Sequence, residues 1–396
     1  MEGSDNVIIL GAGASADAGI PLLRHFINTM WECSVRKQIY GAAIPDNDCC
    51  ILQEAIDIKN ELDTYHGRAL FDDRNIEDIL SILSFNETRG TKADKTRLHC
   101  FIRAISKTIE LTCNVKYENN GSIQDIGSKQ YRRFWINLLN WYKTKRTFPT
   151  IINFNYDLVL ERSLFQVLTN TIFRARDLPF SGININYGYR NSFENKFQIK
   201  EKRYGKEAKQ EGTTIQKRNV ENCLDIEILK LHGSLNFYRE RNRPQSSLFE
   251  ALDDPCILPP VVNKFSYGKA IDKIWSVALN RLRNAKNVII VGYSLPKTDI
   301  YMQYFLKTAL GPNLSLNNIF VFDPVLYKDN EDTRAIIERY GSCFSPQFQR
   351  RIVFQPSIPW GSPSGEYPTK DTFIKNTGGT FEHFVKTINH ESGILF

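Results

Sequence analysis

The stretch Asn6-Val-Ile-Ile-Leu-Gly-Ala-Gly-Ala-Ser-Ala-Asp-Ala-Gly-Ile-Pro21 lies near the start of the chain and decides its fold class. Its first five residues are rich in Val and Ile, which is typical of a buried parallel strand. The glycine-rich residues 11–15 predict a tight turn, and we expect a helix from about Ala16. A strand, a glycine turn and a helix in this order are typical of a Rossmann-like unit, where the backbone approaches a pyrophosphate closely. The spacing departs from the ordinary dinucleotide fingerprint, because the third glycine comes only at Gly19.

The same alternation of short apolar strands with helices returns in the second half of the chain. We expect strands at 150–154, 226–231, 288–291 and 319–322, helices at about 157–168, 270–284 and 300–310, and a last helix near 380–389. This pattern predicts an α/β fold with a Rossmann-like, doubly wound parallel sheet.

Residues 31–148 have a different character, with apolar positions at helical spacing such as Ile76, Ile79, Leu80 and Leu83. We interpret this range as a helical insertion into a sheet domain made of residues 1–30 and 149–396. The polar, charged region 184–222 predicts a hairpin and a loop.

Composition and charge limit the classes of function. The chain has 396 residues, 42% of them hydrophobic, and a formal net charge of +7. No apolar run approaches the roughly 20 residues that span a bilayer, and the polar, acidic start MEGSDN argues against a secretory signal, so we expect a cytoplasmic protein with no membrane contact. The positive charge suits an anionic ligand but does not predict nucleic acid as a direct ligand. The excess of positive charge in 190–218 and 239–243 favours a solvated loop, and a contact with a partner or with nucleic acid stays open.

Two kinds of site are disfavoured by the residues themselves. The eight cysteines include no CxxC pair, so we expect neither a four-thiolate zinc site nor a zinc ribbon, and the histidines show no metal-ligand spacing. We therefore expect no metal. The sequence also has no GxSxG elbow, which argues against serine hydrolase chemistry.

Four polar or glycine-rich segments each follow a predicted strand, in an order that resembles a known superfamily. They are Gly11 to Pro21 with Arg24, Asn153-Phe-Asn-Tyr-Asp157, Lys230-Leu-His-Gly-Ser-Leu235 and Gly292-Tyr-Ser-Leu295, and Asp323 ends the next strand. Together they resemble the motifs of the sirtuin (Sir2) superfamily over residues 6–24 and 150–324.

The departures from protein-deacetylating sirtuins are as informative as the matches. The two CxxC pairs of their zinc ribbon are absent, and their Pro-Asp-Phe-Arg stretch is here Pro21-Leu-Leu-Arg24. Ser266-Tyr267 stand where the Gly-Glu of the acyl-peptide groove is expected. With these differences, the long insertion and the segment Asn75-Ile-Glu-Asp-Ile-Leu80, the chain resembles the sirtuin-like NADases of bacterial antiphage defence.

The resemblance implies that NAD is bound as a substrate, and it assigns roles to individual residues. Asn155 would hold the ribose hydroxyls and the attacking water by donating and accepting at once. His232 would be the general base or the partner of a ribose hydroxyl, and Asp157 would position Asn155 or stabilise the cation. Phosphate and ribose contacts fall to Gly11, Ala12, Gly13, Ser15, Gly19 and Arg24, and the adenosine half to Gly292, Ser294 and Asp323. Structural roles stay open for His232 as a packed strand-end residue, for Asn155 as a strand terminator, for Asp157 as a helix N-cap and for Arg24 in a salt bridge.

The expected activity is NAD+ glycohydrolysis, giving nicotinamide and ADP-ribose or a cyclic product, and depleting NAD in abortive infection. Such a toxic activity needs control, so we expect a homo-oligomer and a regulatory partner such as an ATPase or a phage-sensing subunit. Two alternatives remain open: an NAD-dependent protein deacylase or ADP-ribosyltransferase, and a non-catalytic sensor of NAD or ADP-ribose.

Overall fold

The computed structural model describes most of the chain. The described residues are 5–64, 75–117, 123–125, 129–169, 178–188, 196–203, 211–217, 221–239, 243–244, 248–258, 269–297, 299–327, 331–355 and 380–388.

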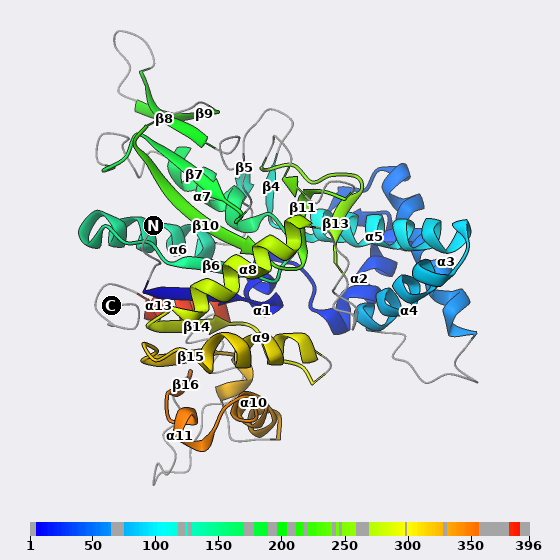
Figure 1. Ribbon diagram of the computed structural model, residues 1–396. Helices are drawn as coiled ribbons and strands as arrows, with labels where there is room; N and C mark the ends of the chain where they lie inside the picture. Colours follow the sequence, from blue (N-terminus) through cyan, green and yellow to red (C-terminus); the bar gives the residue numbers. More distant parts are fainter. Residues whose placement is uncertain are drawn as a thin grey trace.

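A nine-stranded sheet runs through the centre of this described part, in the order β16-β15-β14-β1-β6-β10-β7-β8-β9 (Figure 1). Its strands are β1 (Asn6–Leu10), β6 (Thr150–Asn153), β7 (Gly182–Asn186), β8 (Lys196–Arg203), β9 (Glu211–Lys217), β10 (Cys223–Lys230), β14 (Asn287–Val291), β15 (Asn318–Phe322) and β16 (Ile352–Gln355). Every neighbouring pair from β16 to β7 is parallel, and only β7–β8 and β8–β9 are antiparallel. The predicted α/β class with a parallel sheet is confirmed.

The order of the strands creates a switch point beside β1. The chain passes from β1 to β6 on one side and later returns to β14 on the other, and the register sets Leu10 opposite both Asn153 and Val291. Connections that leave a parallel sheet in opposite directions open a crevice at the carboxyl ends of the strands, and this is where α/β proteins bind ligands.

Helices cover both faces of the sheet, which explains why β1 and β14 are continuous runs of buried Val and Ile. On one side α6 (Lys129–Lys145), α7 (Val159–Thr169) and α13 (Thr380–Thr387) pack together, and on the other α8 (Lys269–Arg283) packs on α9 (Ile300–Leu310), in front of the sheet in Figure 1. The helices α10 (Glu331–Gly341) and α11 (Pro346–Gln349) precede the edge strand β16.

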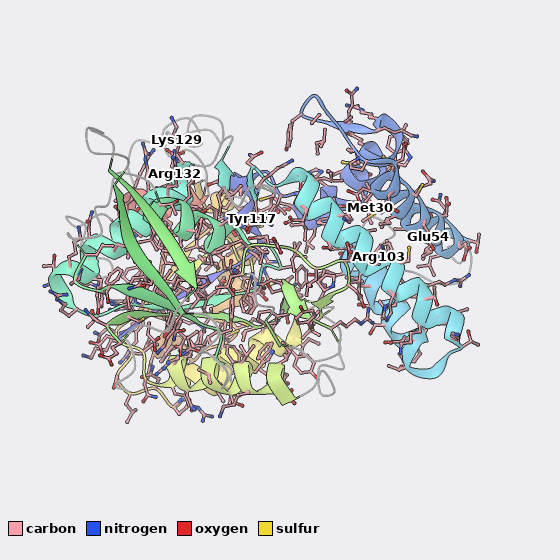
Figure 2. All side chains as sticks on the ribbon, turned by 90° about the horizontal axis from the view of Figure 1, so that it is seen from above. Met30, Glu54, Arg103, Tyr117, Lys129 and Arg132 are labelled. Atoms are coloured by element: carbon pink, nitrogen blue, oxygen red, sulfur yellow. The ribbon has the colours of Figure 1, made fainter. Side chains whose placement is uncertain are left out.

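A group of four helices stands at one side of the sheet domain. It consists of α2 (Leu23–Arg36), α3 (Asp46–Asp63), α4 (Ile76–Arg89) and α5 (Lys92–Thr112), which pack on one another. Figure 2 shows Met30, Glu54 and Arg103 together in this group, away from Lys129 and Arg132 of α6. Although α6 lies inside the predicted insertion range 31–148, it packs on α7 and α13 beside the sheet. We therefore propose α2 to α5 as the insertion proper.

Small strands complete the described part: β2 (Gln38–Ile39) with β3 (Ala42–Ala43), β4 (Val115–Tyr117) with β5 (Ile123–Asp125), and β12 (Arg243–Pro244), β11 (Gly233–Tyr238) and β13 (Pro255–Ile257) in a third sheet. No helix in the described ranges is long and apolar enough to span a membrane.

The first predicted helix is wrong in detail. Instead of a helix from Ala16, the chain forms a short helix α1 (Ala12–Ser15) and a 3-10 turn over Ala16–Ala18. The turn ends at Gly19, whose φ of 85° is left-handed, and α2 begins only after Pro21.

The strand prediction missed β7 and β16. Because β7 is a central parallel strand, its residues Gly182–Asn186 do not belong to the predicted polar hairpin, which is formed by β8 and β9 alone. Asn184 and Asn186 made this strand look polar, but Asn184 is buried and donates to Asp225 on β10.

Candidate functional site

The carboxyl ends of the central strands bring the predicted segments together. Gly11 follows β1, Asn155 follows β6, His232 follows β10 and Gly292 follows β14, so all four lie at one edge of the sheet, around the switch point. This is the edge that the doubly wound topology opens to a ligand.

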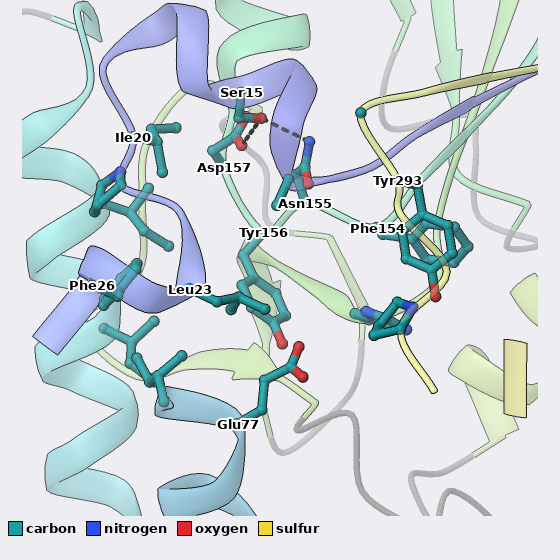
Figure 3. A pocket seen from close by; sticks show the side chains of 18 of the residues that line it. Ser15, Ile20, Leu23, Phe26, Glu77, Phe154, Asn155, Tyr156, Asp157 and Tyr293 are labelled. Carbon is teal, nitrogen blue, oxygen red and sulfur yellow. Dashed lines mark hydrogen bonds between the residues drawn. The ribbon is translucent and has the colours of Figure 1, made fainter. Parts of the chain in front are cut away.

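A short chain of hydrogen bonds joins the first two segments (Figure 3). The Asn155 side-chain N–H donates to Ser15 Oγ at 2.7 Å, and Ser15 Oγ donates to Asp157 Oδ2 at 2.6 Å. All three side chains are at least nine-tenths buried. Asp157 therefore orients Asn155 through Ser15. The serine lies 142 positions from Asp157 and 140 positions from Asn155 in the sequence, so the fold brings distant segments into one relay.

The same contacts fix which atoms Asn155 can offer a ligand. Its Nδ2 also donates to the Gly11 carbonyl oxygen at 2.9 Å, so both amide hydrogens are used within the protein. We expected Asn155 to donate and accept at once; in this geometry Oδ1 is the amide atom left to bind a ligand, and it can only accept. A ribose hydroxyl or a water molecule can supply the proton for that bond.

Asp157 also bonds to the start of α7, although it is not the N-cap: Leu158 lies immediately before the helix, and its carbonyl oxygen accepts from the Arg162 N–H at 2.9 Å. The Asp157 Oδ1 accepts from the Val159 backbone N–H at 3.1 Å, at the start of α7. The bond from Val159 and the bond from Ser15 use the two carboxylate oxygens separately, so a structural and a functional role of Asp157 are compatible.

A buried ion pair supports this loop from beneath the cavity. Lys230 at the end of β10 donates to the Asp157 carbonyl oxygen and lies 3.4 Å from Glu161 Oε1, and both charged side chains have no exposed surface. Tyr187 donates to the same Glu161 oxygen at 2.9 Å. Buried charges are costly unless paired and hydrogen-bonded, so this cluster holds the loop backbone in one position.

The glycine turn packs on protein backbone. The Gly11 N–H donates to the Val291 carbonyl and the Gly13 N–H to the Gly292 carbonyl, each at 2.9 Å. Gly292 has a φ of 65°, and a Cβ there would lie 2.4 Å from the Ala14 nitrogen. The glycines let the turns after β1 and β14 touch. Of the predicted phosphate-binding residues Gly11, Ala12, Gly13 and Ser15, Ala12 and Ser15 line the cavity.

His232 lies in the tight turn between β10 and β11, with 7% of its surface exposed. Its ring lies 5.0 Å from the Phe154 ring and 6.3 Å from the Trp275 ring, between centroids. Its carbonyl oxygen accepts from the Leu258 N–H at 2.9 Å. Backbone and aromatic contacts thus hold the imidazole at the cavity wall.

These segments form one wall of a cavity of about 170 Å³. We call it the sheet-edge wall; it consists of Ala12, Ser15, Phe154, Asn155, Tyr156, Asp157, His232, Gly292, Tyr293, Ser294, Pro296 and Asp299. The opposite side, the helical wall, consists of Leu23, Phe26, Ile76, Glu77, Leu80, Ile105 and Ile109 from α2, α4 and α5, and Ile20 and Pro21 connect the two.

Two further predicted site residues within the described part of the chain, Gly19 and Asp323, do not line this cavity. Gly19 packs against the Thr112 carbonyl and the Asn114 side chain. Asp323 is buried after β15, accepts from the Val325 N–H at 3.0 Å, and burial raises its pKa to about 6. The Arg24 side chain lies outside the described residues, as do Ser266 and Tyr267.

Several lining residues were not predicted. Tyr156 donates to the Leu258 carbonyl at 2.9 Å, and Tyr293 donates to Asp299 Oδ2 at 2.6 Å. Both tyrosines stand inside quoted motifs, and Glu77 stands inside Asn75–Leu80, so position within a motif could have identified them. Phe26 and Asp299 carry no such signal.

No group of three or more His, Cys, Asp or Glu side chains that could hold a metal ion occurs within the described ranges. No family model matches the sequence, and a search of curated proteins finds no match. Among solved structures, a crystal structure described as a Sir2 homolog–NAD complex is similar over 86% of this chain and 91% of that chain, with 11% sequence identity and a TM-score of 0.30.

Proposed function

We propose that this chain is a sirtuin-like NAD+ glycohydrolase that releases nicotinamide and ADP-ribose. The observation that carries the proposal is the Asn155–Ser15–Asp157 relay, which presents an acceptor oxygen in the same cavity as His232 at the switch point of a doubly wound sheet. This placement suits a nucleotide, and the residue types suit hydrolysis at an anomeric carbon.

The reaction does not need covalent catalysis, since the nicotinamide ring of NAD+ is a cationic pyridinium and departs as a neutral leaving group. The electrons of the nicotinamide–ribose bond move to the ring nitrogen and neutralise it, while positive charge develops on the ribose. Water adds to the anomeric carbon and loses one proton. Asn155 Oδ1 would accept a hydrogen bond from the ribose hydroxyl or the water, and His232 would take the proton.

Two features favour hydrolysis over protein deacylation. The sequence has no zinc ribbon, and apolar side chains of α2, α4 and α5 close the side of the cavity opposite Asn155. A site enclosed in this way suits a small nucleotide. We further propose, from the sequence resemblance, that the activity depletes NAD in antiphage defence within the cytoplasm, as a homo-oligomer under the control of a partner protein.

The test is NAD+ consumption by the purified full chain without peptide, with release of nicotinamide measured in the wild type, Asn155→Ala and His232→Ala. We expect cleavage by the wild type and a loss of about 10²-fold to 10⁴-fold in each variant. Turnover that requires an acylated peptide would make the protein a deacylase. Tight binding of NAD+ without turnover, with and without the candidate partner, would make it a sensor.

A further inference from the structure

The peptide that leads into His232 is held by a tryptophan from outside the cavity. Trp275 lies on α8, the helix in front of the sheet in Figure 1, and it is not one of the residues that line the cavity. Its indole N–H donates to the Leu231 carbonyl oxygen at 3.0 Å. Leu231 follows the last residue of β10, so this carbonyl belongs to the peptide bond that joins the end of the strand to His232. The tryptophan therefore acts on the backbone directly before the proposed base.

Trp275 also contacts the imidazole itself, as part of a row of five rings. The centroids of the Trp275 and His232 rings lie 6.3 Å apart, with 33° between the ring planes. On one side of this pair, the Phe305 ring of α9 meets Trp275 edge-on at 5.0 Å. On the other, the Phe154 ring lies 5.0 Å from His232 and 4.9 Å from Tyr293. These separations are those of favourable aromatic contacts, so His232 is packed from two segments of the chain.

The other half of the turn is fixed through its backbone. The His232 carbonyl oxygen accepts from the Leu258 N–H at 2.9 Å. Gly233 has a φ of 85°, and a Cβ there would lie 2.0 Å from the Cys256 carbonyl oxygen. These contacts hold the main chain against β13, but they do not set the two side-chain torsions of the histidine. The direction of the imidazole depends on the groups packed against the ring.

Trp275 is itself held firmly enough to set that direction. Ile271, Ile274 and Ala278 are buried, at no more than 1% exposure, and they fix the rotation of α8. The edge-on contact with Phe305 and the bond to the Leu231 carbonyl fix the indole at its rim and at its nitrogen. A general base must lie within hydrogen-bond reach of the proton that it accepts, and a displacement of about 1 Å can cost about 10²-fold in rate.

We propose that Trp275 is a positioning residue for His232: its indole holds the peptide before the histidine and packs on the imidazole, which keeps the ring directed at the attacking water. This inference rests on the proposed function, in which His232 takes the proton from that water. It extends the machinery of the site beyond the cavity to α8 and, through Phe305, to α9.

The test measures cleavage of NAD+ by the full chain in single turnovers, over a range of NAD+ concentrations, together with the affinity for ADP-ribose. The variants are Trp275→Phe, which keeps an aromatic ring and removes the indole donor, and the same change in a His232→Ala background. Trp135→Phe is the matched control. Trp135 also donates to a backbone carbonyl at 3.0 Å, that of Leu160, and it is fully buried and does not line the cavity. Its replacement disturbs packing at least as much as that of the partly buried Trp275.

We expect Trp275→Phe to lower the rate at saturating NAD+ by about tenfold, because the lost bond leaves the base poorly oriented. The NAD+ concentration for half-saturation and the affinity for ADP-ribose should stay within about twofold, since the tryptophan does not touch the ligand. In the His232→Ala background the same change should lower the rate by less than about twofold, because it acts through the missing histidine. Trp135→Phe should keep the wild-type rate.

Three results would overturn the positioning role and leave the glycohydrolase standing. They are a wild-type rate in Trp275→Phe, an equal loss of rate from Trp275→Phe in the His232→Ala background, and an equal loss in Trp135→Phe. A wild type that leaves NAD+ intact, with and without the candidate partner, would overturn the proposed function and the positioning role together.

Discussion

The two walls of the cavity are built by different physical means. The sheet-edge wall carries polar side chains linked by hydrogen bonds, as in the contacts of Asn155 with Ser15 and Gly11, and Lys230 outside the wall donates to the Asp157 carbonyl. The helical wall is apolar, with Glu77 as its charged member. Under the proposed function, the sheet-edge wall would position the reacting groups, and the helical wall would exclude water and shape the space for the nicotinamide ring.

The two walls are joined by one buried arginine. Arg162 on α7 donates to Glu110 of α5 at 2.8 Å, to the Val115 carbonyl at 3.1 Å and to the Phe249 carbonyl at 2.9 Å, and only 1% of its side chain is exposed. It therefore ties the end of α5 to the helix that follows Asp157. This contact therefore fixes the position of the helical wall relative to the sheet-edge wall.

The largest effect is expected from breaking that joint. Arg162→Ala leaves Glu110 and two carbonyl groups without their donor, and we expect a loss of about 3 kcal/mol in the free energy of unfolding. Chemical denaturation measures it. The control is Arg281→Ala, which removes a two-bond pair with Glu227 at the opposite edge of the sheet, where the arginine is 26% exposed. Equal losses of unfolding free energy in the two variants would mean that Arg162 stabilises the protein no more than an ordinary, partly exposed ion pair does.

The two walls also differ in how far the sequence predicted them. Residues of the sheet-edge wall follow short Val/Ile strands, and parallel strands place their carboxyl ends at one edge, so Asn155, His232 and Gly292 could be brought together from their positions alone. Helical spacing, by contrast, shows that α4 has an apolar face but not what that face meets. The sequence could therefore not place Ile105 or Phe26 in the site.

The hydrogen-bond partners within the sheet-edge wall were also beyond the sequence. The glycine turn suggested free N–H groups for a pyrophosphate, but the Gly11 and Gly13 amides donate to the turn after β14. Ser15 was expected to hold phosphate, and its hydroxyl instead joins Asn155 to Asp157. Which side chains bond to one another depends on differences of a few tenths of an ångström in the distances between distant segments, and the spacing of motifs in a sequence does not specify these distances.

A smaller effect, on activity, is expected from removing the Ser15 hydroxyl in the sheet-edge wall. Ser15→Ala removes the hydroxyl that accepts from Asn155 and donates to Asp157. We expect kcat/KM for NAD+ to fall by about 10-fold to 100-fold, since Asn155 loses one of the two bonds that orient its amide. Ser34→Ala is the control, because it removes another buried serine hydroxyl, bonded to the Trp31 carbonyl on α2. A similar loss of activity in both variants would show that the relay is not what matters.

The smallest expected effect concerns the support beneath the sheet-edge wall. Asp17, two residues after Ser15, accepts from the Glu382 N–H at 3.3 Å and so caps α13, which packs on α1 and α6. Burial, with a smaller contribution from the charge of Glu382, raises the pKa of Asp17 from 3.8 to about 6. The folded state thus binds this proton more tightly than the unfolded state does. The stabilisation is fully present below pH 3.8 and is lost as the pH rises through about 6.

Asp17→Asn keeps an acceptor for the Glu382 N–H and removes the charge. We expect the variant to unfold about 1–3 °C above the wild type at pH 7.5, and the difference to vanish near pH 4, where Asp17 is protonated. Thermal unfolding at a series of pH values measures both. Asp323, whose pKa burial also raises to about 6, should keep part of the pH dependence in the variant. A lower unfolding temperature for Asp17→Asn at pH 7.5 would show that the charged cap stabilises α13 more than burial of the charge costs, and that this side of the sheet-edge wall depends on an ionised carboxylate.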